Sequence, residues 1–141
     1  MPLLNSVAKV ASKPFSNSIH PRAHAVIDYV NVCAFMIGAA SFWRRNRRAA
    51  IGALVAGGTA MLVNLLTDYP GGAKKIIKFH VHRNIDFGLA AMTATLPQFL
   101  GFDDEREKKF FIVEGMLISA VTELSHFPPR TGRPEKHRRA A

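Results

Sequence analysis

The sequence repeats itself after 58 residues, and this internal duplication limits the folds that the chain can adopt. Residues 24–70 align with residues 82–128 without a gap, and nine of the 47 aligned positions are identical. The matches concentrate at the two ends, where HAVIDY aligns with HRNIDF and LTDYP aligns with LSHFP. Such a duplication predicts that one structural unit occurs twice and that the two copies pack on each other.

Each copy of the repeat contains two apolar stretches, which gives four candidate helices. They cover residues 24–43, 49–66, 82–101 and 110–127, close to the length of about 20 residues that a helix needs to cross a bilayer. The second stretch has no charged residue, and its Gly and Ala residues recur at a spacing of four, which allows helices to pack closely in lipid. We therefore predict an all-α protein, a four-transmembrane-helix bundle built from two tandem helical-hairpin repeats, with a soluble four-helix bundle as the alternative.

The predicted hairpins divide the chain into five segments. A flexible N-terminal tail (1–19) precedes the first hairpin (20–70), and a basic connecting loop (71–81) leads to the second hairpin (82–128) and a basic disordered tail (129–141). The N-terminal segment lacks a continuous apolar core, so the sequence does not predict a secretory signal peptide. The one cysteine, Cys33, lies in an apolar run and excludes a disulfide framework within the chain.

The chain carries a net charge of +9, and its basic residues form clusters at 44–48, 74–78 and 130–139. Such clusters are typical either of nucleic-acid binding or of the flanks of membrane helices. No nucleic-acid-binding motif accompanies them, so we predict contact with a lipid bilayer and its anionic headgroups, and no nucleic-acid partner. Twelve of the 19 Lys and Arg residues lie on the side of the predicted bundle that holds the termini, which places both termini in the cytoplasm.

The repeat also places ionisable residues at equivalent positions of its two copies. His24 and Asp28 are four residues apart, and so are His82 and Asp86, so each pair lies on one helix face. Because consecutive helices run in opposite directions, the starts of the first and third helices share one end of the bundle with the ends of the second and fourth. That end gathers the candidate site residues His24, Asp28, Asp68, His82, Asp86 and His126, with Glu123 beside them.

Three roles are open to this cluster. Ionisable groups in a membrane are costly and usually pair with one another, so the cluster can be a structural hydrogen-bond network that joins the two hairpins. His and Asp side chains on facing helices can also bind a transition metal, and His can ligate haem. The third role is that of a small proton or ion carrier that uses the same carboxylates.

The stretches HAVIDY, LTDYPGGAKKI, FHVHRNID and LPQFLGF resemble small bacterial multi-helix membrane proteins that are loosely related to the SPW-repeat family. That family has paired membrane helices with a Ser-Pro-Trp motif at the end of the first, where this chain has Ser41-Phe42-Trp43 and Leu96-Pro97-Gln98. The resemblance covers about residues 20–128 and implies a membrane repeat architecture in the bacterial inner membrane. It implies no activity, cofactor or catalytic residue.

The sequence contains no local signature of a Ser-His-Asp or Cys-His catalytic arrangement, and we predict no catalytic residue. We expect a non-enzymatic small subunit or accessory module of a membrane complex, whose partner is another membrane protein or a second copy of the chain. A metal- or haem-binding membrane protein is the main rival.

Overall fold

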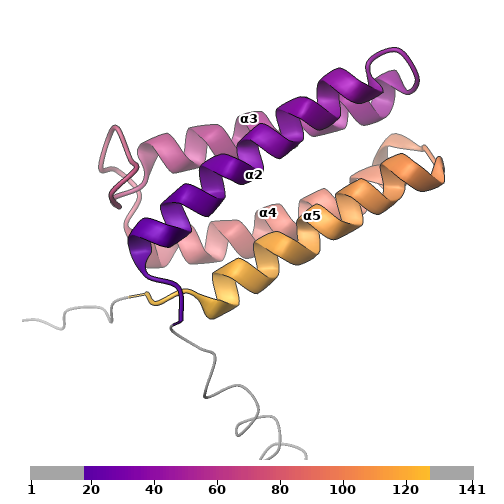
Figure 1. Ribbon diagram of the computed structural model, residues 1–141. Helices are drawn as coiled ribbons and strands as arrows, with labels where there is room; N and C mark the ends of the chain where they lie inside the picture. The colour runs from indigo at the N-terminus through magenta and orange to yellow at the C-terminus, as the bar shows by residue number, and fades with distance from the viewer. Residues whose placement is uncertain (1–17, 128–141) are drawn as a thin grey trace, which may run out of the picture.

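The computed structural model describes residues 18–127, and within this range it contains four α-helices and no strand (Figure 1). The helices are α2 (Pro21–Phe42), α3 (Arg47–Leu66), α4 (Phe79–Leu100) and α5 (Glu105–Leu124). The prediction of an all-α fold with four helices is confirmed. The predicted tails lie outside the described residues, except for residues 18 and 19.

The helices form two antiparallel hairpins that pack on each other (Figure 1). Four residues separate α2 from α3, and four separate α4 from α5, and such short connections place consecutive helices side by side. The packing is most extensive within each hairpin, weaker between α3 and α4, and weaker still between α2 and α5. The two hairpins therefore approach each other more closely on the α3–α4 side than on the α2–α5 side.

Local sequence signals explain most of the helix ends. Pro21 lies in the first turn of α2, where its missing N–H is not needed. The side chain of Asn46 caps α3 by accepting a hydrogen bond of 3.0 Å from the N–H of Ala49. Gly101 ends α4 in the left-handed conformation, with φ of 63°. Helix α4 begins at Phe79, so the last three residues of the predicted connecting loop are helical.

Small residues allow α2 and α3 to pack closely. A β-carbon on Gly57 of α3 would lie 2.7 Å from Cβ of Phe35 on α2 and 2.6 Å from Cε of Met36. A β-carbon on the neighbouring Gly58 would meet no atom within 4 Å. The face of α3 that turns inward is therefore made of small side chains, and its buried residues are Ala49, Ala50, Gly52, Ala53, Ala56, Gly57, Ala60 and Asn64.

The two repeats are related by a pseudo-twofold axis, because equivalent residues face each other across it. Asn46 and Asp104 are 58 positions apart, and Nδ2 of Asn46 donates a hydrogen bond of 2.6 Å to Asp104 Oδ2. At the other end of the bundle, two isolated β-bridges join Ile19 to Ser125 and Thr67 to Ile77. Ile77 is the equivalent of Ile19, and Thr67 is the equivalent of Ser125, so the pseudosymmetry maps one bridge onto the other. The duplication in the sequence is thus a pseudosymmetry of the structure.

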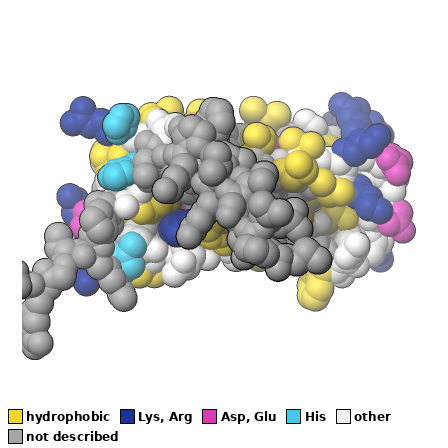
Figure 2. All heavy atoms as spheres, turned by 90° about the horizontal axis from the view of Figure 1, so that it is seen from below, with side chains coloured by type: hydrophobic (Ala, Val, Ile, Leu, Met, Phe, Trp, Pro, Cys, Tyr) yellow, Lys and Arg dark blue, Asp and Glu magenta, His cyan; other side chains and the backbone are white. Residues whose placement is uncertain are grey.

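Large apolar side chains remain exposed on all four helices. Charged side chains and histidines gather mainly toward the two ends of the bundle, with apolar side chains between them (Figure 2). Helices α2 and α3 are long and apolar enough to cross a membrane. The exposed apolar side chains include Val26, Val30 and Ile37 on α2, Leu54, Val55 and Leu62 on α3, Phe87 and Phe99 on α4, and Val113, Met116 and Leu117 on α5.

Candidate metal centre

Two histidines meet on the pseudo-twofold axis at one end of the bundle. His24 and His82 are each the fourth residue of their helices, α2 and α4, and both side chains are fully buried. Their Nε2 atoms lie 3.3 Å apart, and the two rings are inclined by 74°. The edge of each imidazole that carries Nε2 therefore faces its equivalent from the other repeat.

One carboxylate oxygen from each repeat joins the two imidazole nitrogens. Oδ2 of Asp28 lies 3.3 Å from Nε2 of His24 and 3.3 Å from Nε2 of His82. Oδ2 of Asp86 lies 3.4 Å and 3.1 Å from the same two atoms. Each aspartate follows its own histidine by one helical turn, so the same helix face carries both side chains to the axis. We call these four residues the His/Asp cluster.

The opposite edge of each imidazole is held by a hydroxyl group. Nδ1 of His24 lies 2.6 Å from Oγ of Ser125, and Nδ1 of His82 lies 2.8 Å from Oγ1 of Thr67. Each hydroxyl donates its one hydrogen to a backbone carbonyl of its own helix, at Val121 (2.6 Å) and Val63 (2.7 Å). The hydroxyls must then accept from the histidines, so the network assigns the proton of both neutral imidazoles to Nδ1.

With the protons at Nδ1, only hydrogen-bond acceptors face the centre of the cluster. The Nε2 atom of a neutral imidazole protonated at Nδ1 carries a lone pair and no hydrogen, and an ionised carboxylate has no hydrogen to donate. Tyr69 and Thr122 donate hydrogen bonds to Asp28 (3.2 Å) and Asp86 (3.3 Å), but from outside the cluster. Converging buried acceptors require a cation between them: extra protons on the histidines or a metal ion.

The spacing of the two imidazole nitrogens and one carboxylate oxygen matches the demands of a small metal ion. A tetrahedral ion with ligands at about 2.0–2.1 Å keeps its ligand atoms about 3.3–3.4 Å apart. The two imidazole nitrogens and the Asp86 oxygen form a triangle with sides of 3.1–3.4 Å, and those nitrogens and the Asp28 oxygen form a second triangle with sides of 3.3 Å. Each triangle has the dimensions of one face of such a coordination sphere, and the ligand atoms of His24, His82 and Asp86 all lie within 4.8 Å of one another.

Aromatic rings enclose the His/Asp cluster. Phe79 packs against both imidazoles, with ring centroids 5.4 Å from His24 and 5.9 Å from His82. Tyr69 contacts His82 at 5.3 Å, and Phe127 contacts His24 at 5.6 Å. These rings pack directly against both imidazoles. Burial, followed by the negative charge of Asp28, raises the pKa of Tyr69 above its ordinary value.

The structure does not bring Asp68, Glu123 and His126 into the cluster. Asp68 lies at the surface and pairs with Lys75 at 3.3 Å, and Glu123 pairs with Arg83 at 3.5 Å. His126 is exposed. For Asp68 and His126 the backbone explains the departure from the prediction: α3 and α5 end before these two residues, and their N–H groups bond to the carbonyls of Ile77 and Ile19. The turn out of the helix directs their side chains away from the axis.

Residues outside the predicted set complete the site. Thr67 and Ser125 hold the imidazoles, and they are equivalent positions of the repeat, so the alignment itself contained the signal. Asn64 is buried near the end of α3, and its Nδ2 has no hydrogen-bond partner within the described part of the chain. Its equivalent is Thr122, which donates to Asp86.

Comparisons with protein-family models, with curated proteins and with solved structures found no match to this chain. The resemblance to SPW-repeat proteins stays a prediction.

Proposed function

We propose that this protein is a membrane protein that binds one divalent transition-metal ion through His24, His82 and Asp86, with the carboxylate of Asp28 beside both histidines. One observation carries the proposal: the Nδ1 atoms of two imidazoles face hydroxyl oxygens, and their Nε2 atoms lie 3.1–3.4 Å from each other and from two carboxylate oxygens. Imidazole and carboxylate ligands at this spacing fit Zn²⁺ best among the common ions.

The position of the ion supports a structural role in the membrane module. Each hairpin contributes one histidine, so the ion would join the two halves of the bundle where the duplication brings them together. Hydroxyl groups of Thr67 and Ser125 would orient the ligands from outside, as partners of metal-bound histidines commonly do. This role agrees with the predicted accessory module of a membrane complex, whose partner stays a prediction.

Elemental analysis of the purified protein tests the metal proposal. We expect about one Zn²⁺ per chain after purification in detergent without chelators, and loss of that ion in His82→Ala and Asp86→Asn. The matched control is His126→Ala, which removes an exposed histidine outside the cluster and should retain the metal. Wild-type protein that neither contains a stoichiometric metal nor binds Zn²⁺, Fe²⁺ or Mn²⁺ in titrations would contradict the proposal.

Thermal unfolding separates the metal centre from the hydrogen-bond network that the sequence also allows. A ligand that binds only the folded state at 100 times its Kd stabilises that state by about 2.7 kcal/mol. If an ion joins the hairpins, chelation should lower the unfolding temperature of the wild type and leave that of His82→Ala unchanged. A wild-type unfolding temperature that is insensitive to chelator and to added metal, together with a lower value for His82→Ala, would favour the network.

We further propose that all four helices cross a bilayer, in the bacterial inner membrane, with both termini in the cytoplasm. The exposed apolar side chains of all four helices support this placement, because lipid removes the cost of their exposure to water. The excess of Lys and Arg on the side of the termini supports the orientation. Recovery of the protein in the membrane pellet after an alkaline wash is the expected result, and recovery in the soluble fraction without detergent would contradict it.

A further inference from the structure

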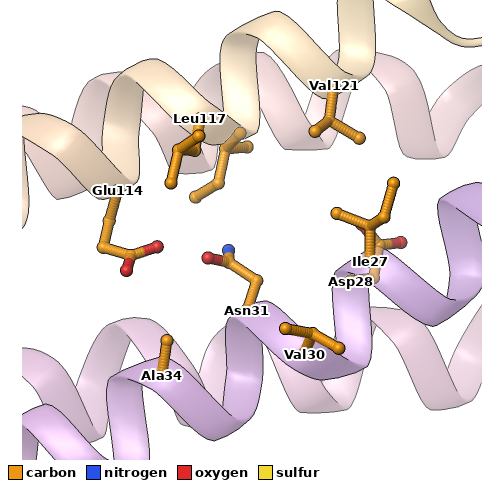
Figure 3. A pocket seen from close by; sticks show the side chains of 9 residues that line it. Ile27, Asp28, Val30, Asn31, Ala34, Glu114, Leu117 and Val121 are labelled. Atoms are coloured by element: carbon orange, nitrogen blue, oxygen red, sulfur yellow. The ribbon is translucent and has the colours of Figure 1, made fainter.

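A groove with a volume of about 150 Å³, partly open to the surface of the bundle, lies between α2 and α5, and we call it the cavity. Its walls are mostly aliphatic and include Ile27 on α2 and Leu117 and Val121 on α5 (Figure 3). Two residues interrupt the apolar lining, Asn31 of α2 and Glu114 of α5, whose side chains point toward each other across the gap (Figure 3). A polar pair inside an apolar cavity is typical of a binding site for a small molecule.

Among residues 18–127, no side chain pairs with the buried carboxyl group of Glu114. Its side chain is only 7% exposed, and its Oε2 atom is buried without a hydrogen-bond partner in the described range 18–127. A buried carboxyl group that lacks a partner lowers the stability of the fold. Glu114 lines the cavity, so a ligand with a donor group would supply the missing partner there.

The pseudosymmetry shows that this cavity belongs to one side of the bundle only. The equivalent of Asn31 in the other repeat is Leu89, and the equivalent of Glu114 is Ala56. Both are buried in the apolar core, with exposed fractions of 7% and 0%. The polar pair is therefore absent where α3 and α4 pack together. The repeats share the four residues of the His/Asp cluster and differ at the cavity.

The cavity reaches the His/Asp cluster through Asp28. This residue lines the cavity, and its carboxylate contacts both imidazoles at 3.3 Å. The side chain of Asp28 is 16% exposed, whereas that of its equivalent, Asp86, is 7% exposed. A molecule in the cavity, between α2 and α5, would thus lie beside Asp28 of the His/Asp cluster.

We propose that the cavity binds a small molecule with an apolar body of about six carbon atoms and a protonated amine as its head group. The size follows from the volume, since an apolar cavity of about 150 Å³ holds a molecule such as benzene. The head group follows from the lining: carboxyl oxygens of Asp28 and Glu114 outnumber the one donor group, the amide of Asn31, and an ammonium group supplies three donors and a positive charge. The proposal deepens the proposed function by adding a ligand beside its metal centre.

Fluorine NMR of the full-length protein in detergent, with 4-fluorobenzylamine as the probe, tests this proposal. The amine should bind the wild type saturably and at least ten times more tightly than 4-fluorobenzyl alcohol or 4-fluorotoluene. Glu114→Ala and Asn31→Leu copy the residues of the other repeat, and each should weaken binding of the amine at least tenfold. Glu114→Gln, which keeps the shape of the side chain, serves if Glu114→Ala does not fold. Glu123→Ala removes an exposed carboxylate from the same helix and should change the affinity less than twofold.

Three results would overturn the proposal: no saturable binding of the amine to the wild type, equal affinity for amine and alcohol, or unchanged binding in both Glu114→Gln and Asn31→Leu. The metal content of the same samples separates this proposal from that of the metal centre. A protein that retains stoichiometric metal but does not bind the amine overturns the ligand alone. Saturable amine binding that depends on Glu114, in a protein without metal, supports the cavity and overturns the metal centre.

Discussion

The hydroxyl group of Thr67 should control the metal affinity of His82, although it touches no ligand atom of the proposed centre. It accepts a hydrogen bond from Nδ1 of His82 at 2.8 Å and donates a hydrogen bond to the carbonyl of Val63. Thr67→Val keeps the volume of the side chain and removes both bonds. Nδ1–H of the fully buried His82 then has no acceptor, and the imidazole loses the contact that holds its Nε2 lone pair toward the cluster.

The size of the effect follows from the two lost functions of the hydroxyl. A buried donor without a partner costs about 1–3 kcal/mol, which should lower the stability of the metal-free protein. Loss of an outer hydrogen-bond partner of a metal-bound histidine costs about 10- to 100-fold in affinity, or about 1.4–2.7 kcal/mol. Ser125→Ala should act in the same way through His24, since that contact is 2.6 Å.

Competition titrations of Zn²⁺ against a chelator, on detergent-purified variants, measure this effect directly. Thr95→Val is the matched control, because Thr95 also donates to a carbonyl of its own helix, at Ala91 (2.9 Å), but lies at the surface and contacts no histidine. We expect the control to bind within twofold of the wild type. If Thr67→Val also binds Zn²⁺ within twofold of the wild type, the assignment of the Nδ1 proton and the role of the hydroxyl are refuted.

Two further predictions concern packing and pH. Gly57→Ala should lower the free energy of unfolding by about 1–3 kcal/mol, because its β-carbon would meet Phe35 at 2.7 Å. Gly58→Ala should raise the free energy of unfolding by up to about 1 kcal/mol. SDS unfolding titrations measure both changes, and equal shifts would count against close helix packing. The raised pKa of Tyr69 means that the unfolded chain loses this proton at about pH 10 while the folded protein keeps it, so the free energy of unfolding should fall above that pH. Tyr69→Phe, which copies Phe127, should reduce that slope, and an unchanged slope would disprove the linkage.

Much of the fold could be predicted because the determining signals are local. Apolar stretches of helical length and short connections indicate four helices in two hairpins, and the offset of 58 indicates that the hairpins are equivalent. The His-x-x-x-Asp spacing also places each histidine and its aspartate on one helix face, since side chains four residues apart are neighbours there. These inferences require only the geometry of a single helix.

The remaining part of the site depends on how each helix ends and rotates in the bundle. Asp68 and His126 lie within two residues of the helix ends, where the backbone turns toward Ile77 and Ile19, and no spacing rule indicates that their side chains leave the axis. The partnership of Thr67 with His82 likewise joins residues from two different helix ends. The cavity beside Glu114 exists because the α2–α5 interface packs less closely than its equivalent, the α3–α4 interface. A comparison of the two repeats in the sequence does not reveal this difference.

The sequence by itself determined the duplication, the four helices and the pairing of histidine with aspartate on two of them, because these follow from periodicity along one chain. Only the tertiary structure decided that His24, His82, Asp28 and Asp86 meet on the pseudo-twofold axis, with hydroxyls holding the opposite edges of both imidazoles. The physical reason is that contacts within 3.1–3.4 Å depend on the rotation and separation of packed helices, and these are set by side chains distributed over the whole bundle.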